Sequence, residues 1–301
     1  MTFPLIVAGL LVGVSVGLTG MGGGALMTPI LVMLFGVNPT AAVGSDLLAS
    51  VAMKPVGAAV HQRAGTIRWD LVRWLVPAAV PAAFAGAFAF HLLGHGELLQ
   101  HRVKLAIGMA LLLAVVGMIA RVVIVRRRGD TDETEPQPVR PVPTLLIGLV
   151  GGLIVGMTSV GSGSLIIVML MLTHPRLQAR QLVGTDLVQA IPLVAAAAAG
   201  HLVAGDTQLA LTGTLLIGAI PGIYAGAKLA TRVPGGALRW ILAILLLGSG
   251  LSLWDVPQAI TITACAAMAV AAGVTTWLGR RTRTATGAGA GTGTSVTASR
   301  H

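Results

Sequence analysis

The sequence predicts an all-α fold. The expected architecture is a polytopic membrane helical bundle with two inverted repeats, each with a broken, re-entrant helical hairpin, plus one extra C-terminal helix. Three observations predict it. The composition is 55% hydrophobic and only 10% charged. The apolar residues form long continuous runs, and the second half of the chain repeats the pattern of the first.

The composition indicates which solvent surrounds the protein. A soluble domain carries roughly a quarter charged residues, whereas charge is costly in lipid. The mean hydropathy is +0.87, and the apolar runs do not alternate as barrel strands do. The net charge of +10 is concentrated in short loops and the tail, as topology signals are. We therefore expect the lipid bilayer as a partner and no nucleic acid.

The duplication is carried by polar residues and prolines held in one register, shifted by 139 to 140 residues. The stretch 19–26 aligns with 158–165, and the Gly-Ser-Asp-Leu at 44–47 aligns with the Gly-Thr-Asp-Leu at 184–187. Further along, His61 aligns with His201. Chance matches between apolar helices involve alanine and leucine rather than such residues, so the repeat is a firm prediction.

Each half contains five apolar segments, which sets the domain boundaries. We predict a first transmembrane repeat at 1–125, a second at 143–255 and an extra transmembrane helix at 256–279. The charged, proline-rich joint at 126–142 is a poor helix and reads as a solvent linker. The tail at 280–301 is rich in Arg, Thr, Gly and Ala and is predicted to be disordered.

The loop charges and the segment count both predict that the repeats are inverted. An odd number of segments turns the second copy over, and basic loops mark the cytoplasmic side. This places the linker and the C-terminal tail in the cytoplasm of a multi-pass protein in the cell membrane. The loop at 94–104 departs from the pattern, because it puts Arg102 and Lys104 on the external side.

The glycine-rich stretches in each half precede segments that are too short to span. The segment at 24–36 covers about 20 Å at the helical rise, against roughly 30 Å of hydrocarbon. Each stretch therefore predicts a turn inside the membrane, where the free N–H groups of a helix start favour an anion. The alternative is that these glycines only permit close packing. The candidate substrate-binding residues are Thr19, Gly22, Gly23, Gly24, Lys54, Thr158, Ser159, Gly161, Ser162 and Gly163.

Six further polar residues lie in or beside the third segment of each half: Ser45, Asp46, His61, Thr185, Asp186 and His201. The two aspartates either cap a helix start or couple transport to a proton or cation. The two histidines either make interfacial hydrogen bonds or titrate near neutral pH. Lys54 has Val194 as its second-half counterpart, so it pairs with an aspartate or meets the anion itself.

The sequence lacks the marks of an enzyme or a metalloprotein. We find no CxxC, HExxH, GxSxG or Walker loop, and the histidines lack metal-ligand spacing. We therefore expect neither catalysis nor a metal or other cofactor. The sequence makes no prediction of oligomeric state.

Three motifs resemble the TauE/SafE family of sulfite exporters over about residues 5–255. They are GLTGMGGGALMTPIL at 17–31, VGSDLLASVAMKPVGAAVHQRAGTIRW at 43–69 and VGTDLVQAIPLVAAAAAGHLVAGD at 183–206. The chain departs from the family pattern at Ser45, where threonine is commoner, and at Ser162, which replaces a glycine. The resemblance implies a plasma-membrane transporter for sulfur-containing anions such as sulfite, thiosulfate or organosulfonates.

The residues and the resemblance lead to one functional expectation. Inverted repeats are typical of secondary transporters, whose site lies near mid-membrane between the repeats. We expect transport of a small anion by alternating access, with the anion between the two glycine loops near Lys54. An anion channel is the first alternative, and a membrane enzyme or redox subunit using His61 and His201 is the second.

Overall fold

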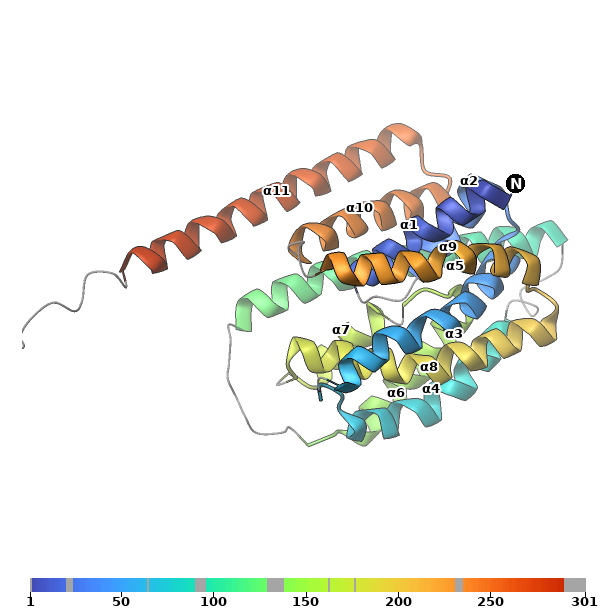
Figure 1. Cartoon of the computed structure of the whole chain (residues 1–301), viewed down its shortest axis with the longest axis horizontal. Helices are drawn as coiled ribbons and strands as arrows, with labels where there is room; N and C mark the ends of the chain where they lie inside the picture. The colour runs from blue at the N-terminus through green and yellow to red at the C-terminus, as the bar shows by residue number, and fades with distance from the viewer. Residues whose placement is uncertain are drawn as a thin grey trace, which may run out of the picture.

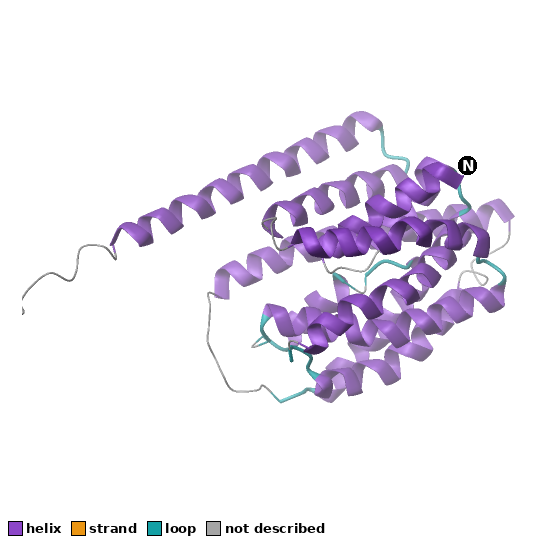
Figure 2. Ribbon diagram, viewed as in Figure 1, coloured by secondary structure: helices purple, strands orange, loops and turns teal. Residues whose placement is uncertain are grey.

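The computed structural model describes residues 2–19, 24–63, 65–89, 96–128, 138–161, 163–175, 177–230 and 235–289. These residues form helices joined by short loops and contain no strand (Figure 2). Five of the helices are long and apolar enough to cross a membrane by length and composition. The predicted fold class, a polytopic helical membrane protein, is therefore confirmed.

The helices follow the segments expected from the sequence (Figure 1). The first half comprises α1 (Thr2–Thr19), α2 (Gly24–Phe35), α3 (Pro39–Arg63), α4 (Trp69–Ala89) and α5 (Gly96–Arg128). The second half comprises α6 (Pro141–Thr158), α7 (Leu165–Thr173), α8 (Ala179–Ala204), α9 (Leu209–Ala230) and α10 (Gly235–Leu253). The extra helix is α11 (Gln258–Gly289).

Two boundaries differ from the sequence prediction. The helix α11 runs to Gly289, so 280–289 is helical although a disordered tail was expected from 280. The helix α5 continues to Arg128, into the predicted linker. Arginine is a good helix former, so α5 extends through the arginines at 126–128, whereas half of 280–289 is threonine and glycine and helix propensity does not explain the length of α11. The middle of the linker, 129–137, and the end of the tail, 290–301, lie outside the described residues.

The short helices expected after the glycine stretches are present. The 12 residues of α2 and the 9 of α7 extend about 18 Å and 14 Å at the helical rise, well short of a bilayer. The helix α6 ends because Ser159 adopts a left-handed conformation with φ 59°, followed by Gly161 at φ 118°. The corresponding turn of the first half, 20–23, lies outside the described residues.

The two halves pack against each other through equivalent pairs of helices. The first helix of each half packs against the fourth helix of the other, in the pairs α1–α9 and α6–α4. Both crossings are so close that a Cβ atom has no room. A Cβ on Gly13 would clash with the carbonyl oxygen of Ala219, and one on Gly152 would clash with that of Ala79. Glycine at these positions lets the backbones touch.

Near the middle of the bundle, α3 packs against α8 and α5 against α10. Two hydrogen bonds between the halves have the same pattern, one made to α8 and the other to α3. The N–H of Arg68, before α4, donates to the hydroxyl of Thr185 at 3.0 Å, and the N–H of Gln208, before α9, donates to that of Ser45 at 3.4 Å. Equivalent residues thus make equivalent bonds to the opposite half, which supports the repeat. Its inversion relative to the membrane stays a prediction.

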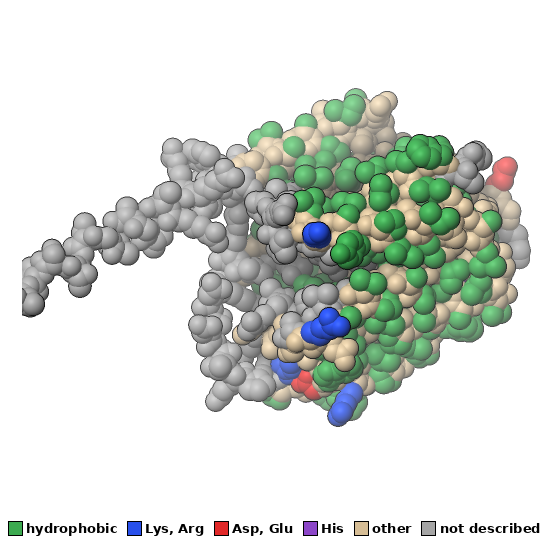
Figure 3. Space-filling model, viewed as in Figure 1, with side chains coloured by type: hydrophobic (Ala, Val, Ile, Leu, Met, Phe, Trp, Pro, Cys, Tyr) green, Lys and Arg blue, Asp and Glu red, His purple; other side chains and the backbone are tan. Residues whose placement is uncertain are grey.

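Charged side chains avoid the middle of the visible surface (Figure 3). Apolar side chains cover the flank of the bundle, and the lysines and arginines seen in this view gather toward the end where the linker runs. Leu11, Val116 and Ile217 are among the large apolar side chains exposed on the described helices. A surface of this kind fits lipid rather than water.

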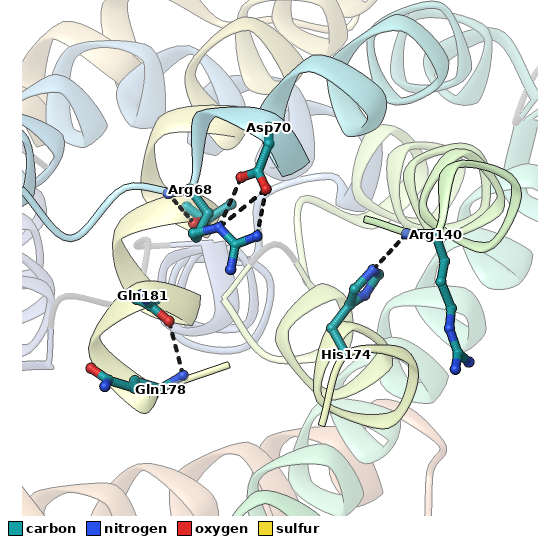
Figure 4. Close-up of polar contacts among 7 residues, drawn as sticks. Arg68, Asp70, Arg140, His174, Gln178 and Gln181 are labelled. Carbon is teal, nitrogen blue, oxygen red and sulfur yellow. Dashed lines mark hydrogen bonds and ion pairs between the residues drawn. The ribbon is translucent and has the colours of Figure 1, made fainter. Parts of the chain in front are cut away.

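The linker end of the bundle is held by short polar contacts (Figure 4). Arg68 forms an ion pair with Asp70, and the N–H of Arg140 donates to Nε2 of His174 at 3.2 Å. Burial, together with the nearby guanidinium groups of Arg140 and Arg68, lowers the pKa of His174 below its ordinary value. A neutral imidazole accepts a hydrogen bond at one nitrogen, as His174 does here.

Candidate functional site

The two aspartates lie inside their helices, so the capping interpretation is wrong. Asp46 lies seven residues after Pro39, where α3 starts, which is about 10 Å along the axis. The start of α3 is capped by Asn38, whose side-chain oxygen accepts the N–H of Thr40 at 3.1 Å. In the second half, Gln178 and Gln181 form a capping box at the start of α8, and Asp186 lies two turns further on.

Asp46 joins the two halves through one carboxylate oxygen. Its Oδ2 accepts the hydroxyl of Thr28, on α2, at 2.8 Å and the hydroxyl of Ser159, at the end of α6, at 2.7 Å. The side chain is fully buried, and its Oδ1 has no hydrogen-bond partner among the described residues. A buried carboxylate oxygen without a donor is costly, so this atom is poised to take a proton or a cation.

Lys54 is the cation of this region. It lies eight residues after Asp46 on α3 and is only 4% exposed. Its electrostatic interaction with Asp186 is stronger than its interaction with Asp46. Asp186 also accepts the side-chain N–H of Gln189 at 3.0 Å. Electrostatic interaction with two carboxylates is in keeping with the requirement that buried charges be paired, and a direct contact of Lys54 with either aspartate stays a prediction.

The turn after α6 is built by its own hydroxyls. Thr158 donates through Oγ1 to the carbonyl of Ile154 at 2.7 Å and accepts the N–H of Val160 at 3.2 Å. In this structure its hydroxyl therefore bonds to the backbone at the end of α6. Ser159 differs, because its side chain points away from its own turn to Asp46. A non-glycine residue in the left-handed region is strained, and the bond to a carboxylate offsets that strain.

The sequence analysis expected the N–H groups at the start of α7 to be free to bind an anion. In the structure they are not free. Those of Ser164, Leu165 and Ile166 converge on the carbonyl oxygen of Gly161, at 3.3, 3.0 and 3.3 Å. The carbonyl thus occupies the position expected for an anion. Gly161 takes this position with φ 118°, which glycine adopts readily and other residues rarely do.

His201 is buried instead of lying at a wet interface. It is 0% exposed, and its Nε2 lies 2.9 Å from the carbonyl oxygen of Gly156 on α6. Its Nδ1 lies 3.4 Å from Asp206. The carbonyl of Gly156 is close to the break in α6, so His201 provides a partner for a backbone group near the helix end. This contact assigns His201 to helix packing.

Several candidates cannot be placed. Residues 20–23, which include Gly22 and Gly23, and Ser162 lie outside the described residues. Their predicted role in binding stays a prediction. The side chains of Thr19 and His61 are likewise undescribed. Gly24 is the first residue of α2, and Gly163 lies in the turn before α7. Of the remaining candidates, the structure joins Asp46 to Ser159 by a hydrogen bond, and Lys54 interacts electrostatically with Asp46 and Asp186.

Two members of the site were missed by the sequence analysis. Thr28, which donates to Asp46, lies inside one of the motifs that carry the family resemblance. Gln189, which donates to Asp186, lies three residues along the same helix, a spacing at which side chains meet. A search for hydroxyl or amide donors able to satisfy the two buried carboxylates would have indicated both. In the described part of the chain, no three His, Cys, Asp or Glu side chains gather where they could hold a metal ion.

Comparison with known proteins gives a consistent result. A family model described as "Sulfite exporter TauE/SafE" matches residues 5–253. A Bacillus subtilis (strain 168) protein named "Probable membrane transporter protein YjnA" is 38% identical over 257 residues, covering 84% of this chain and all of that protein. Another from the same strain, "Probable membrane transporter protein YdhB", is 26% identical over 78% of this chain and 93% of its own. No solved structure matches.

Proposed function

This chain belongs to the sulfite exporter TauE/SafE family and is a multi-pass membrane transporter, and we propose that it carries small sulfur-containing anions by alternating access. The substrate site would lie between the two broken helix pairs, beside Lys54. Family membership supports transport and the chemical class of the substrate. The described residues support the place and the manner of binding.

The observation that carries this proposal is the bridge at Asp46. One carboxylate oxygen holds the short helix α2 of the first half and the α6–α7 turn of the second half through Thr28 and Ser159. Alternating access moves elements of one repeat against those of the other. A bridge between the two broken helix pairs is therefore where such a movement would be controlled.

The buried charges favour coupling of the anion to a proton or a cation. Asp46, Lys54 and Asp186 are the buried ionisable groups of this region in the described chain, and two carboxylates with one ammonium leave one net negative charge. An anion brought to Lys54 would add like charge in a poorly screened place. A proton or cation on Oδ1 of Asp46 would neutralise that charge and weaken the bridge.

The second part of the site would be the turn at the start of α7. Three N–H groups converge there on the carbonyl of Gly161, as donors converge on an anion at a helix start. We propose that the anion displaces this carbonyl during transport. Gly161 and Gly163 would permit the change because glycine adopts several backbone conformations at little cost.

We propose the orientation from the two ends of the bundle. Arg63, Arg68 and Arg140 flank helix ends on the linker side, whereas Arg102 and Lys104 lie at the opposite end of α5. The positive-inside rule then assigns the linker and the tail to the cytoplasm of the cell membrane. The opposite end would face outward.

The proposal is tested by Lys54→Met, which keeps the length of the side chain and removes its charge. Loss of the cation nearest the anion should lower sulfite flux in proteoliposomes about tenfold or more, since each tenfold corresponds to ~1.4 kcal/mol. The matched control is Val194→Met, the equivalent position on α8 in the second half, where flux should be largely retained. Unchanged flux in Lys54→Met would remove Lys54 from the site.

A flux assay also separates a carrier from a channel. In a carrier, sulfite flux saturates, and unlabelled sulfite on the far side accelerates the exit of labelled sulfite. A flux that rises in proportion to concentration, with no such counter-transport, would identify a channel instead. Size-exclusion chromatography of each variant is the control for whether the protein remains folded.

A further inference from the structure

An open cavity with a mixed polar and apolar lining lies at the end of the bundle opposite the linker. Its volume is about 680 Å³, and its walls come from the C-terminal end of α2, the loop before α3, the start of α5 and the end of α10. Its polar lining residues are Asn38, Gln100, His101, Lys104 and Ser252. The cavity is open to the surface and is separate from the bridge at Asp46.

The cavity contains an unsatisfied polar group. The side-chain oxygen of Gln100 is buried and has no hydrogen-bond partner among the described residues. Buried polar atoms are nearly always satisfied by protein or by ordered water. This oxygen is enclosed by protein, so water or a ligand hydroxyl in the cavity would reach it only if the side chain of Gln100 turned outward.

Lys104 provides the charge, and its present partner is replaceable. Its Nζ donates to Asp255 at 2.6 Å, and the side chain of Asp255 is 64% exposed. The ion pair with Lys104 lowers the pKa of Asp255 below its ordinary value, so this carboxylate is negative at neutral pH. Exposed ion pairs contribute little stability, so another anion can compete for Lys104.

The cavity also adjoins the bridge through a single helix. Val32 and Met33 of α2 line the cavity, and Thr28, which donates to Asp46, lies one turn earlier on the same helix. One turn of helix rises about 5.4 Å. An anion held in the cavity would thus be close to the element that the bridge controls.

We propose that this cavity is an anion-binding antechamber at the external mouth of the transporter, in which Lys104 holds a small oxyanion in exchange for Asp255. The inference rests on the proposed function for the identity of the anion, but the binding site itself can be tested apart from transport. It also accounts for Lys104, which lines the cavity, on a side where basic residues are otherwise disfavoured.

The first test compares two neutral substitutions on neighbouring residues. Lys104→Gln should raise the KM for sulfite about tenfold in proteoliposomes, with kcat little changed, because only capture is impaired. The matched control is Arg102→Gln, which removes the same charge from the same turn of α5 but does not line the cavity. Its KM should change less than about twofold, as expected for a screened surface charge. Equal effects of the two variants would overturn the proposal.

The second test uses the competing carboxylate. Asp255→Asn removes the internal anion, and asparagine tolerates the left-handed φ of 53° found at this position. The KM for sulfite should fall about two- to threefold, within the range that an exposed ion pair permits. An unchanged or higher KM would show that Asp255 does not compete with the anion.

A binding measurement separates the antechamber from the transport function. Trp254, next to Asp255, donates its indole N–H to the carbonyl of Leu105 at 3.0 Å, so its fluorescence reports on this region. Sulfite should change the fluorescence of the parent protein in detergent, and it should do the same in Lys54→Met. In Lys104→Gln the change should be absent. Trp254→Phe defines the background. A response that persists in Lys104→Gln would overturn the antechamber, whereas failure of transport alone would leave it standing.

Discussion

The helix crossings and the buried centre of this transporter follow different rules. At the crossings the two halves are alike, since Gly13 against Ala219 in α1–α9 is matched by Gly152 against Ala79 in α6–α4. At the centre they differ. Asp46 receives hydroxyls from α2 and from the opposite half, whereas Asp186 receives the amide of Gln189 on its own helix.

Residues of the buried centre differ between the halves, whereas the glycines at the helix crossings are the same in both. In the register of the repeat, Lys54 corresponds to Val194, Ser159 to Gly20 and Gln189 to Ala49. Packing of two equivalent helix pairs requires equal shapes, so glycine recurs. In the proposed site, binding one anion requires one cation and one set of donors, so Lys54, Ser159 and Gln189 have no polar counterpart in the other half although the aspartates do. The repeat thus supplies a symmetric scaffold around an asymmetric site.

The largest expected effect tests the symmetric part. Gly13→Leu and Gly152→Leu each force a side chain into a neighbouring backbone carbonyl, which close-packed helices cannot accommodate. Overpacking costs ~1–3 kcal/mol even for added methylenes, and a branched side chain at a backbone contact should exceed that. Both variants should yield little folded protein by size-exclusion chromatography and thermal denaturation.

The matched control is Gly213→Leu on α9, where nothing lies within 4 Å of an added Cβ. This variant should fold as well as the parent, because leucine is a better helix former than glycine by up to ~1 kcal/mol. If Gly13→Leu folds while Gly152→Leu does not, the two crossings are not equivalent, and the comparison between the halves breaks.

An intermediate effect is expected at Ser159, in the asymmetric part. Ser159→Ala removes a hydrogen bond to a buried carboxylate, worth ~1.5–3 kcal/mol, and keeps the left-handed strain. Ser159→Gly makes the position like Gly20 of the first half, losing the same bond but relieving the strain. Both should reduce sulfite flux, and the glycine variant should melt at the higher temperature. Equal flux in parent and variants would show that the bridge does not control transport.

The smallest effect is expected from the two bonds that repeat between the halves. Thr185→Val and Ser45→Ala each remove one hydroxyl that accepts a backbone N–H, at a cost of ~1 kcal/mol. The loss should be somewhat greater for Thr185→Val, because its bond is 3.0 Å against 3.4 Å for Ser45. Thermal denaturation in detergent measures the difference. A large loss in only one variant would limit the symmetry to the crossings.

The course of the helices was predictable because lipid leaves a strong mark on sequence. A run of apolar residues between polar loops identifies each helix, and the glycine stretches correctly indicated the breaks before α2 and α7. The ends were less predictable, since α5 continues past its apolar stretch on helix-forming arginines and α11 continues past its own without such a signal.

The site was predictable in its residue types and less so in their partners. A carboxylate in an apolar segment must be satisfied, which identified Asp46 and Asp186. Which donor satisfies it depends on contacts between helices far apart in sequence, so the pairing of Asp46 with Ser159, 113 residues away, could not be deduced. The fit of three N–H groups to the Gly161 carbonyl depends on a single φ angle and left no sequence pattern.

In the proposed mechanism, the Gly161 carbonyl sets an upper limit on how tightly the transporter can hold its anion. The turn before α7 is closed by its own backbone, so an arriving anion has to compete with a group that is always present at the same place. The apparent affinity would equal the intrinsic affinity multiplied by the fraction of molecules in which the carbonyl has moved aside. Weak binding of this kind speeds release, and a transporter's turnover depends on release as much as on capture.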